Sequence, residues 1–150
     1  MGLLDELKFK GSIATQLIRD QHINTVKTCE KFLNDNLNKK EFVEHIYFLL
    51  SIHFKIKEEI LYPPFKQILE KYLPYAEPLK MVLAEHKGVK NLLYKFENIN
   101  DGHDYLKDIS ELLLQDVYKE ENGILNQIDL LMPEDMKKEV SEKIKNFIEK

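Results

Sequence analysis

The helical character of this chain is clearest in the segment LKMVLAEHKGVKNLLYKF, residues 79–96. Its apolar side chains recur every three or four residues, which places them on one face of an α-helix. The members of that face are Leu79, Val82, His86, Val89, Leu93 and Phe96. No segment of the chain alternates over more than a few residues, as a half-buried strand would. The segment therefore predicts an amphipathic helix with a histidine on its buried face.

The same periodicity continues outward from this helix, between turn signals rich in Pro, Gly and Asn. We expect helices from about Ser12 to Asn34, from Lys39 to a break at Tyr62-Pro63-Pro64, from Phe65 to Leu73, from Pro78 to just before Asn98, from Asp104 to Leu131, and a short one after Pro133. Short connections favour antiparallel neighbours. The predicted fold is all-α, an antiparallel up-down-up-down four-helix bundle with short extra helical segments at the termini. We expect a single domain over residues 1–150 with its core at about 12–131.

Composition limits the class of protein. The 150 residues are 43% hydrophobic with 5 Gly and 5 Pro, enough for a helical core that needs no disulfide. The net charge is −4 and Arg19 is the single arginine, which disfavours nucleic-acid binding. A single cysteine, Cys29, fits a reducing compartment. We recognise no signal peptide or transmembrane span, and expect a cytoplasmic protein with no nucleic-acid or membrane partner.

Three predicted helices each carry one histidine on the apolar face. His22 lies in line with Ile18, His53 in line with Leu49, and His86 in line with Val82. A single buried histidine usually forms a hydrogen bond with a carbonyl group. Three imidazoles turned inward each need a partner, and one shared metal would satisfy all of them. The pattern therefore favours a metal site inside the bundle.

The helix predicted at 104–131 adds two carboxylates to its apolar face. That face reads Leu106, Ile109, Leu113, Asp116, Glu120 and Ile124. Asp116 and Glu120 are four residues apart and share one side of the helix. Burying an unpaired charge costs several kcal/mol, so each carboxylate needs a cation. Either a metal ion or a salt bridge from Lys57 or Lys119 would supply it.

Two further acids, Glu58 and Glu59, follow His53 out of phase. In a regular α-helix the residue in register with His53 is Lys57, and both acids would be solvated at the surface. A local π-bulge would bring Glu58 into register with His53. Which of Glu58 and Glu59 serves the interior stays open. The remaining candidates have simpler interpretations: we expect His45 and His103 to be structural or surface residues, and Cys29 to be a core residue.

Together these motifs resemble the hemerythrin-like family of HHE cation-binding domains. The resemblance rests on Asp20-Gln21-His22, His53-Phe54, Glu58-Glu59-Ile60-Leu61-Tyr62-Pro63, Glu85-His86 and Asp116-Val117-Tyr118-Lys119-Glu120-Glu121-Asn122, and covers about residues 12–131. Two features depart from the family pattern. Asp116 stands where the family has histidine, and Glu58 comes one position later after His53 than the family spacing.

The resemblance implies a non-haem di-iron site in the bundle interior. Its nitrogen ligands would be His22, His53 and His86, and its oxygen ligands would be Glu58, Asp116 and Glu120. An aspartate at 116 would make the site harder and more anionic, and suits iron or manganese. Whether Asp116 is a ligand stays open. The displaced Glu58 would weaken a bridge between metals, which leaves a single metal ion as the alternative to two.

The functions that the resemblance implies fall into three classes. The first is a protein that binds or senses O₂ or a related small molecule such as another diatomic or peroxide. The second is a di-metal enzyme of the peroxidase or oxidase type, which would consume peroxide or O₂ in steady state. The third is a helical interaction module with a degenerate metal site, in which His53→Ala and His86→Ala would change neither stability nor bound metal. We expect the first; the residues identify no protein partner.

Overall fold

The computed structural model describes residues 13–72, 77–99 and 102–149 of the chain. These residues form helices with no strand among them, which confirms the all-α prediction. The elements are α2 (Ile13–Leu33), α3 (Lys39–Phe48), the π-helices η1 (Leu49–His53) and η2 (Ile56–Leu61), α4 (Tyr62–Tyr72), α5 (Glu77–Glu97), α6 (His103–Asn122), α7 (Ile124–Leu131) and α8 (Glu134–Glu149). The helix ends predicted at Ser12 and Leu73 lie outside the described residues.

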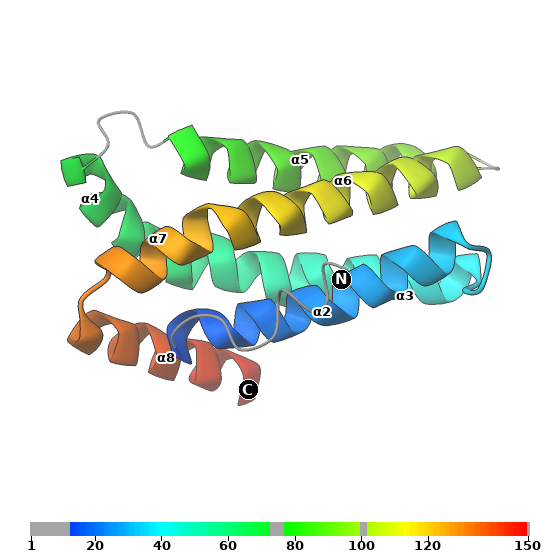
Figure 1. Cartoon of the computed structure of the whole chain (residues 1–150). Coiled ribbons are helices and arrows are strands. Elements are labelled where there is room, and N and C mark those ends of the chain that lie inside the picture. The colour runs from blue at the N-terminus through cyan, green and yellow to red at the C-terminus, as the bar shows by residue number, and fades with distance from the viewer. Residues whose placement is uncertain (1–12, 73–76, 100–101, 150) are drawn as a thin grey trace.

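The long helices lie side by side, as Figure 1 shows, with α6 packed against both α5 and α2. The turn at 34–38 returns the chain from α2 to α3, and the Asn38 side chain accepts a 2.8 Å hydrogen bond from the Glu41 amide as an N-cap. The final helix, α8, packs on α2 and η2. The antiparallel up-down-up-down order stays a prediction. No helix within the described ranges is both long and apolar enough to cross a membrane.

The predicted break at Tyr62-Pro63-Pro64 is wrong. Helical structure runs without interruption from Lys39 to Tyr72, and both prolines lie in the first turn of α4. Proline is favoured in the first turn of an α-helix, and here the two rings directly follow the π-helical turn η2, which ends at Leu61. The π-helices just before α4 also change the phase of the apolar face. Leu61 is therefore fully buried, whereas Ile60, which α-helical spacing from Ile56 would place on the apolar face, is only partly buried.

The single helix predicted from Asp104 to Leu131 is divided at Gly123, which separates α6 from α7. Gly123 has φ −132° and ψ −96°, and a Cβ atom there would lie 2.8 Å from the carbonyl oxygen of Lys119. Only glycine fits this close approach without a shift of the backbone. The C-terminal helix also differs from the prediction. It is 16 residues long and buries Val140 and Ile144 in the core.

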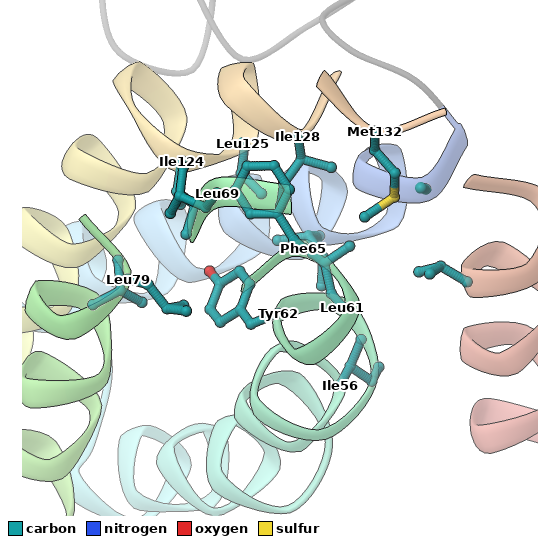
Figure 2. Close-up of a cluster of buried hydrophobic side chains, with 14 of the residues drawn as sticks. Ile56, Leu61, Tyr62, Phe65, Leu69, Leu79, Ile124, Leu125, Ile128 and Met132 are labelled. Atoms are coloured by element: carbon teal, nitrogen blue, oxygen red, sulfur yellow. The ribbon is translucent and has the colours of Figure 1, made fainter. Parts of the chain in front are cut away.

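The hydrophobic core consists of two main clusters with polar side chains between them. The first gathers residues of α4, α7 and α8 with the start of α2 and α5, and Figure 2 shows its members around Tyr62 and Phe65. The second lies toward the turn at 34–38, where the rings of Phe32 and Phe42 stack at 4.3 Å. Along α2, α5 and α6 the apolar residues of one cluster give way to polar ones before the other begins. The polar centre is therefore closed off by apolar layers on both sides.

Candidate metal centre

The three inward-facing histidines predicted from the sequence are all buried. His22 of α2, His53 of η1 and His86 of α5 are each at most 1% exposed. The His22 and His53 rings lie edge to face with centroids 4.9 Å apart, and the His86 ring stacks on Phe54 at 3.9 Å. Three separate helical segments thus bring imidazoles into the polar layer between the core clusters.

Each of these rings is held through its Nδ1 atom. The Nδ1 contacts are to Glu121 Oε2 at 2.6 Å for His22, to Gln21 Oε1 at 2.5 Å for His53, and to Glu58 Oε2 at 3.0 Å for His86. Because all three partners are oxygen acceptors, Nδ1 carries the proton in the neutral imidazole. In that neutral form the Nε2 atom keeps its lone pair. Burial lowers the pKa of His22 and of His86, but the neighbouring carboxylates outweigh it and raise both pKa values, so a metal ion would displace a proton from these rings. This arrangement, with one nitrogen fixed by an acceptor and the other free to coordinate, is typical of metal-binding histidines.

Two carboxylates of α6 lie near the Nε2 atoms of His22 and His86. His86 Nε2 is 3.5 Å from Asp116 Oδ2 and 4.0 Å from Glu120 Oε1. His22 Nε2 is 3.5 Å from Glu120 Oε2. Ligand atoms of His86, Asp116 and Glu120 all lie within 4.8 Å of one another. These ligand atoms are close enough together to bind the same metal ion.

Several buried atoms of this cluster have no hydrogen-bond partner among the described residues. They are His22 Nε2, His86 Nε2 and Asp116 Oδ1. Unpaired buried polar atoms are rare in folded proteins, and they can mark a place where an ion or a water molecule binds. Imidazole nitrogen with carboxylate oxygen is a donor set that suits iron or manganese. On these grounds the residues present fit one metal cation.

A lysine already lies in the cluster. Lys57 of η2 is fully buried, and its Nζ is 2.7 Å from Glu120 Oε2 and 3.6 Å from Asp116 Oδ2. The salt-bridge interpretation of the two carboxylates is therefore confirmed for Lys57. Lys119 contacts Glu85 instead, at 3.2 Å. The cluster thus contains an ammonium group as well as metal-type donors.

The predicted π-bulge after His53 is present as η2, and a second π-helical turn, η1, ends at His53. The bulge brings Glu58 to His86 Nδ1, on the side of the ring away from Asp116, and Glu58 also pairs with Lys90 at 3.4 Å. The Glu58 side chain is 26% exposed, and Glu59 is exposed. Glu58 is therefore the acid that reaches an interior histidine, His86, and it lies on the side of that ring away from the α6 carboxylates.

The charges of the cluster shift its ionisation. Burial raises the pKa of Glu120, but the nearby Lys57 and His22 outweigh that effect and hold the pKa well below its ordinary value. Burial, together with the charge of Glu120, raises the pKa of Asp116 to about 6. Burial and the Lys57 charge hold the pKa of His53 well below its ordinary value. The ammonium group thus favours an ionised Glu120 and a neutral His53.

Sequence reasoning did not identify four residues around the cluster. The Tyr62 hydroxyl donates to Glu120, Arg19 pairs with Glu121, and Gln21 and Glu121 bind histidine Nδ1 atoms. Gln21 and Glu121 each directly adjoin a predicted ligand in the chain. Their positions on the helix do not follow the apolar series, so the sequence pointed to them only as neighbours of a predicted ligand.

The histidines and the cysteine that the sequence placed outside the site lie away from the cluster. His45 Nε2 is 3.2 Å from Thr25 Oγ1, and Cys29 is buried in the second core cluster. His103 packs beside Phe32. The structural interpretations of these residues therefore agree with the structure.

Comparison with known protein families matches residues 13–128 to the hemerythrin HHE cation binding domain. No curated protein and no solved structure gives a match. The matched range contains all three buried histidines and both carboxylates of α6. Because the match spans well over half of the chain, this protein belongs to the hemerythrin HHE cation-binding family.

Proposed function

We propose that this protein binds a single transition-metal ion, iron or manganese, in the centre of the bundle and uses it to bind or sense O₂ or a related small molecule. The observation that carries the proposal is the convergence of His86, Asp116 and Glu120, whose ligand atoms lie within 4.8 Å of one another. His22 and His53 would complete the coordination through Nε2. A bound iron or manganese ion supplies redox chemistry with small oxidants.

One ion is a better fit than two. Glu58 is engaged by His86 Nδ1 and Lys90, so its role is to orient a ligand. Glu120 Oε2 is shared with the Lys57 ammonium, which leaves fewer oxygen atoms for a second ion. A bridged pair of metals requires carboxylates that contact both ions at once. The donors whose ligand atoms converge are one imidazole and two carboxylates, with His22 Nε2 beside Glu120, and this set suits one centre.

The surroundings favour a small uncharged ligand over an organic substrate. Apolar clusters enclose the polar layer on both sides, and Phe54 stacks on His86. A surface hollow of about 220 Å³ is lined by Leu50, Phe54, Lys55, Glu58, Glu59 and Lys90. Two of these residues, Phe54 and Glu58, contact the His86 ring. A diatomic molecule entering there would be one side chain away from the cluster.

The test is metal content by elemental analysis after anaerobic loading with Fe²⁺ and removal of free iron. We expect close to one iron per chain, and an absorption spectrum that differs between air and reductant. His86→Ala and Asp116→Ala should lose most of the bound iron, whereas His103→Ala, on α6 beside Phe32, should keep it. Iron at background level in the unmodified protein would contradict the proposal. A stoichiometry of two would contradict the single-ion form of it.

A further inference from the structure

Lys57 places a positive charge at the centre of the bundle, where its side chain is shielded from water. Its side chain is 0% exposed, and Nζ lies 2.7 Å from Glu120 Oε2, 3.6 Å from Asp116 Oδ2 and 5.1 Å above the Phe54 ring. Removing an ammonium group from water is costly, and the two carboxylates and the aromatic face offset that cost. Lys57 in turn stabilises the two buried carboxylates, because each of them needs a cation.

The local geometry explains why a lysine reaches this place. A π-helical turn holds more residues than an α-helical one, so Lys57 and Glu58, four and five residues after His53, both lie on the inner side, with Lys57 buried and Glu58 partly exposed. The π-helical turn at Ile56–Leu61 then lets the next residue, Glu58, remain close to His86. The widened turn thus places a cation inside the cluster and an acid behind it.

The ammonium contacts the same oxygen atoms that face the histidine Nε2 atoms. Glu120 Oε2 lies 2.7 Å from Lys57 Nζ and 3.5 Å from His22 Nε2, and Asp116 Oδ2 lies 3.6 Å from Lys57 Nζ and 3.5 Å from His86 Nε2. A metal ion coordinated by these oxygens would therefore stand close to the ammonium. Two positive charges a few ångströms apart in a buried site repel each other strongly. The Lys57 ammonium group and a metal ion therefore cannot bind Glu120 at full strength at the same time.

We propose that Lys57 is a built-in cation that stands in for a metal ion: it keeps the bundle folded without metal, and it competes with an incoming metal ion for Glu120. The metal part of this inference rests on the proposed function. Metal binding then requires the ammonium group to release Glu120, which weakens the affinity for metal. In the metal-free protein, however, the Lys57 ammonium group balances the buried charge of Asp116 and Glu120.

The decisive variant is Lys57→Met, which keeps most of the length of the unbranched side chain and removes its charge. Without metal, we expect its unfolding temperature to fall by roughly 10 °C, because Asp116 and Glu120 lose their cation. With Fe²⁺ or Mn²⁺, we expect at least a tenfold lower Kd than in the unmodified protein, and a larger rise in unfolding temperature on loading. Lys57→Gln, which keeps a hydrogen-bond donor, serves as a second neutral variant if the methionine protein does not fold without metal.

Lys137→Met is the matched control. Lys137 is a mostly buried lysine of α8 that binds the Asp129 carbonyl and Glu134, both of which lie outside the cluster. Its loss should lower the unfolding temperature and leave the metal Kd unchanged. Metal binding with the same Kd in the unmodified and Lys57→Met proteins would overturn the inference and leave the proposed function intact. The absence of metal binding in every protein tested would overturn the proposed function itself, and the competition with it.

Discussion

Arg19 of α2 and Glu121 of α6 form an ion pair in which neither side chain is more than 1% exposed. The same Glu121 carboxylate accepts a hydrogen bond from Nδ1 of His22 at 2.6 Å. Arg19 also binds Asp129 of α7 at 2.8 Å. The single arginine of the chain therefore joins α2 to both α6 and α7, and it fixes the carboxylate that orients one histidine of the cluster.

Replacement of Arg19 tests the strength of this connection. Arg19→Met leaves Glu121 as a buried charge without its principal partner, and the free energy of unfolding should fall by about 3–5 kcal/mol. Urea denaturation followed by circular dichroism measures the change. Lys143→Met, which removes the exposed pair with Glu139, is the control and should change the value by less than about 0.5 kcal/mol. An equal fall in the free energy of unfolding in the two variants would show that the buried pair stabilises the fold no more than the exposed one.

The two adjacent acids of η2 provide a sharp comparison for metal binding. Glu58 accepts from His86 Nδ1, whereas Glu59 is exposed. Loss of an acceptor that orients a metal-binding histidine typically lowers metal affinity about 10–100-fold. Glu58→Ala should therefore weaken Fe²⁺ or Mn²⁺ binding by that factor in a competition titration, and Glu59→Ala should not. An equal effect of the two substitutions would remove Glu58 from the site.

The buried hydroxyl of Tyr62 donates to Glu120, and burial together with the Glu120 charge raises the pKa of Tyr62 well above its ordinary value. The phenol therefore keeps its proton. Tyr62→Phe removes a hydrogen bond to a charged group, and we expect the free energy of unfolding to fall by about 1.5–3 kcal/mol. Tyr118→Phe removes a hydroxyl from a side chain that is 59% exposed and should be nearly neutral. A neutral result at Tyr62 would mean that water or another donor replaces the hydroxyl.

Acid should weaken the fold partly through His45, which lies outside the metal cluster. Burial lowers the pKa of His45 to about 4 in the folded protein, against about 6.5 in the unfolded chain. Between these values the unfolded chain binds more protons, so stability falls as the pH drops from about 6.5 to 4. Across that window the stability of the unmodified protein should fall by about 1–2 kcal/mol more than that of His45→Gln, less than the full pKa shift implies because the ring is partly exposed. Parallel pH profiles from urea denaturation of the two proteins would contradict the assignment.

Helix positions and buried faces were largely predictable because they depend on local periodicity. The series through His86 and the series through Asp116 and Glu120 both lie on the buried sides of their helices. The end of the second long helix was not predictable in the same way. A π-turn changes the phase by one residue, and proline pairs are read as breaks unless the turn before them is known. Gly123 likewise divides a helix through its unusual backbone angles, which a single glycine in the sequence does not specify.

The cluster itself was predictable in its inner members and less so in the residues that support them. His22, His53, His86, Asp116 and Glu120 follow apolar spacing, so their shared depth could be inferred. Gln21 and Glu121 sit beside ligands in the chain, and their contacts depend on the rotation and packing of neighbouring helices. Lys57 was foreseen as a partner for the carboxylates. Its register with His53 pointed to the interior, but the choice between Lys57 and Lys119 also depends on the rotation of the neighbouring helices, which the sequence does not specify.

Removing Lys57 alone from the chain would leave Glu58 four residues after His53, the spacing that a regular α-helix needs to aim both side chains the same way. By this spacing, deletion of one residue would replace an inward-facing ammonium group with an inward-facing carboxylate. The widened turn at Ile56–Leu61 accommodates the extra residue within a helical run that continues to Tyr72.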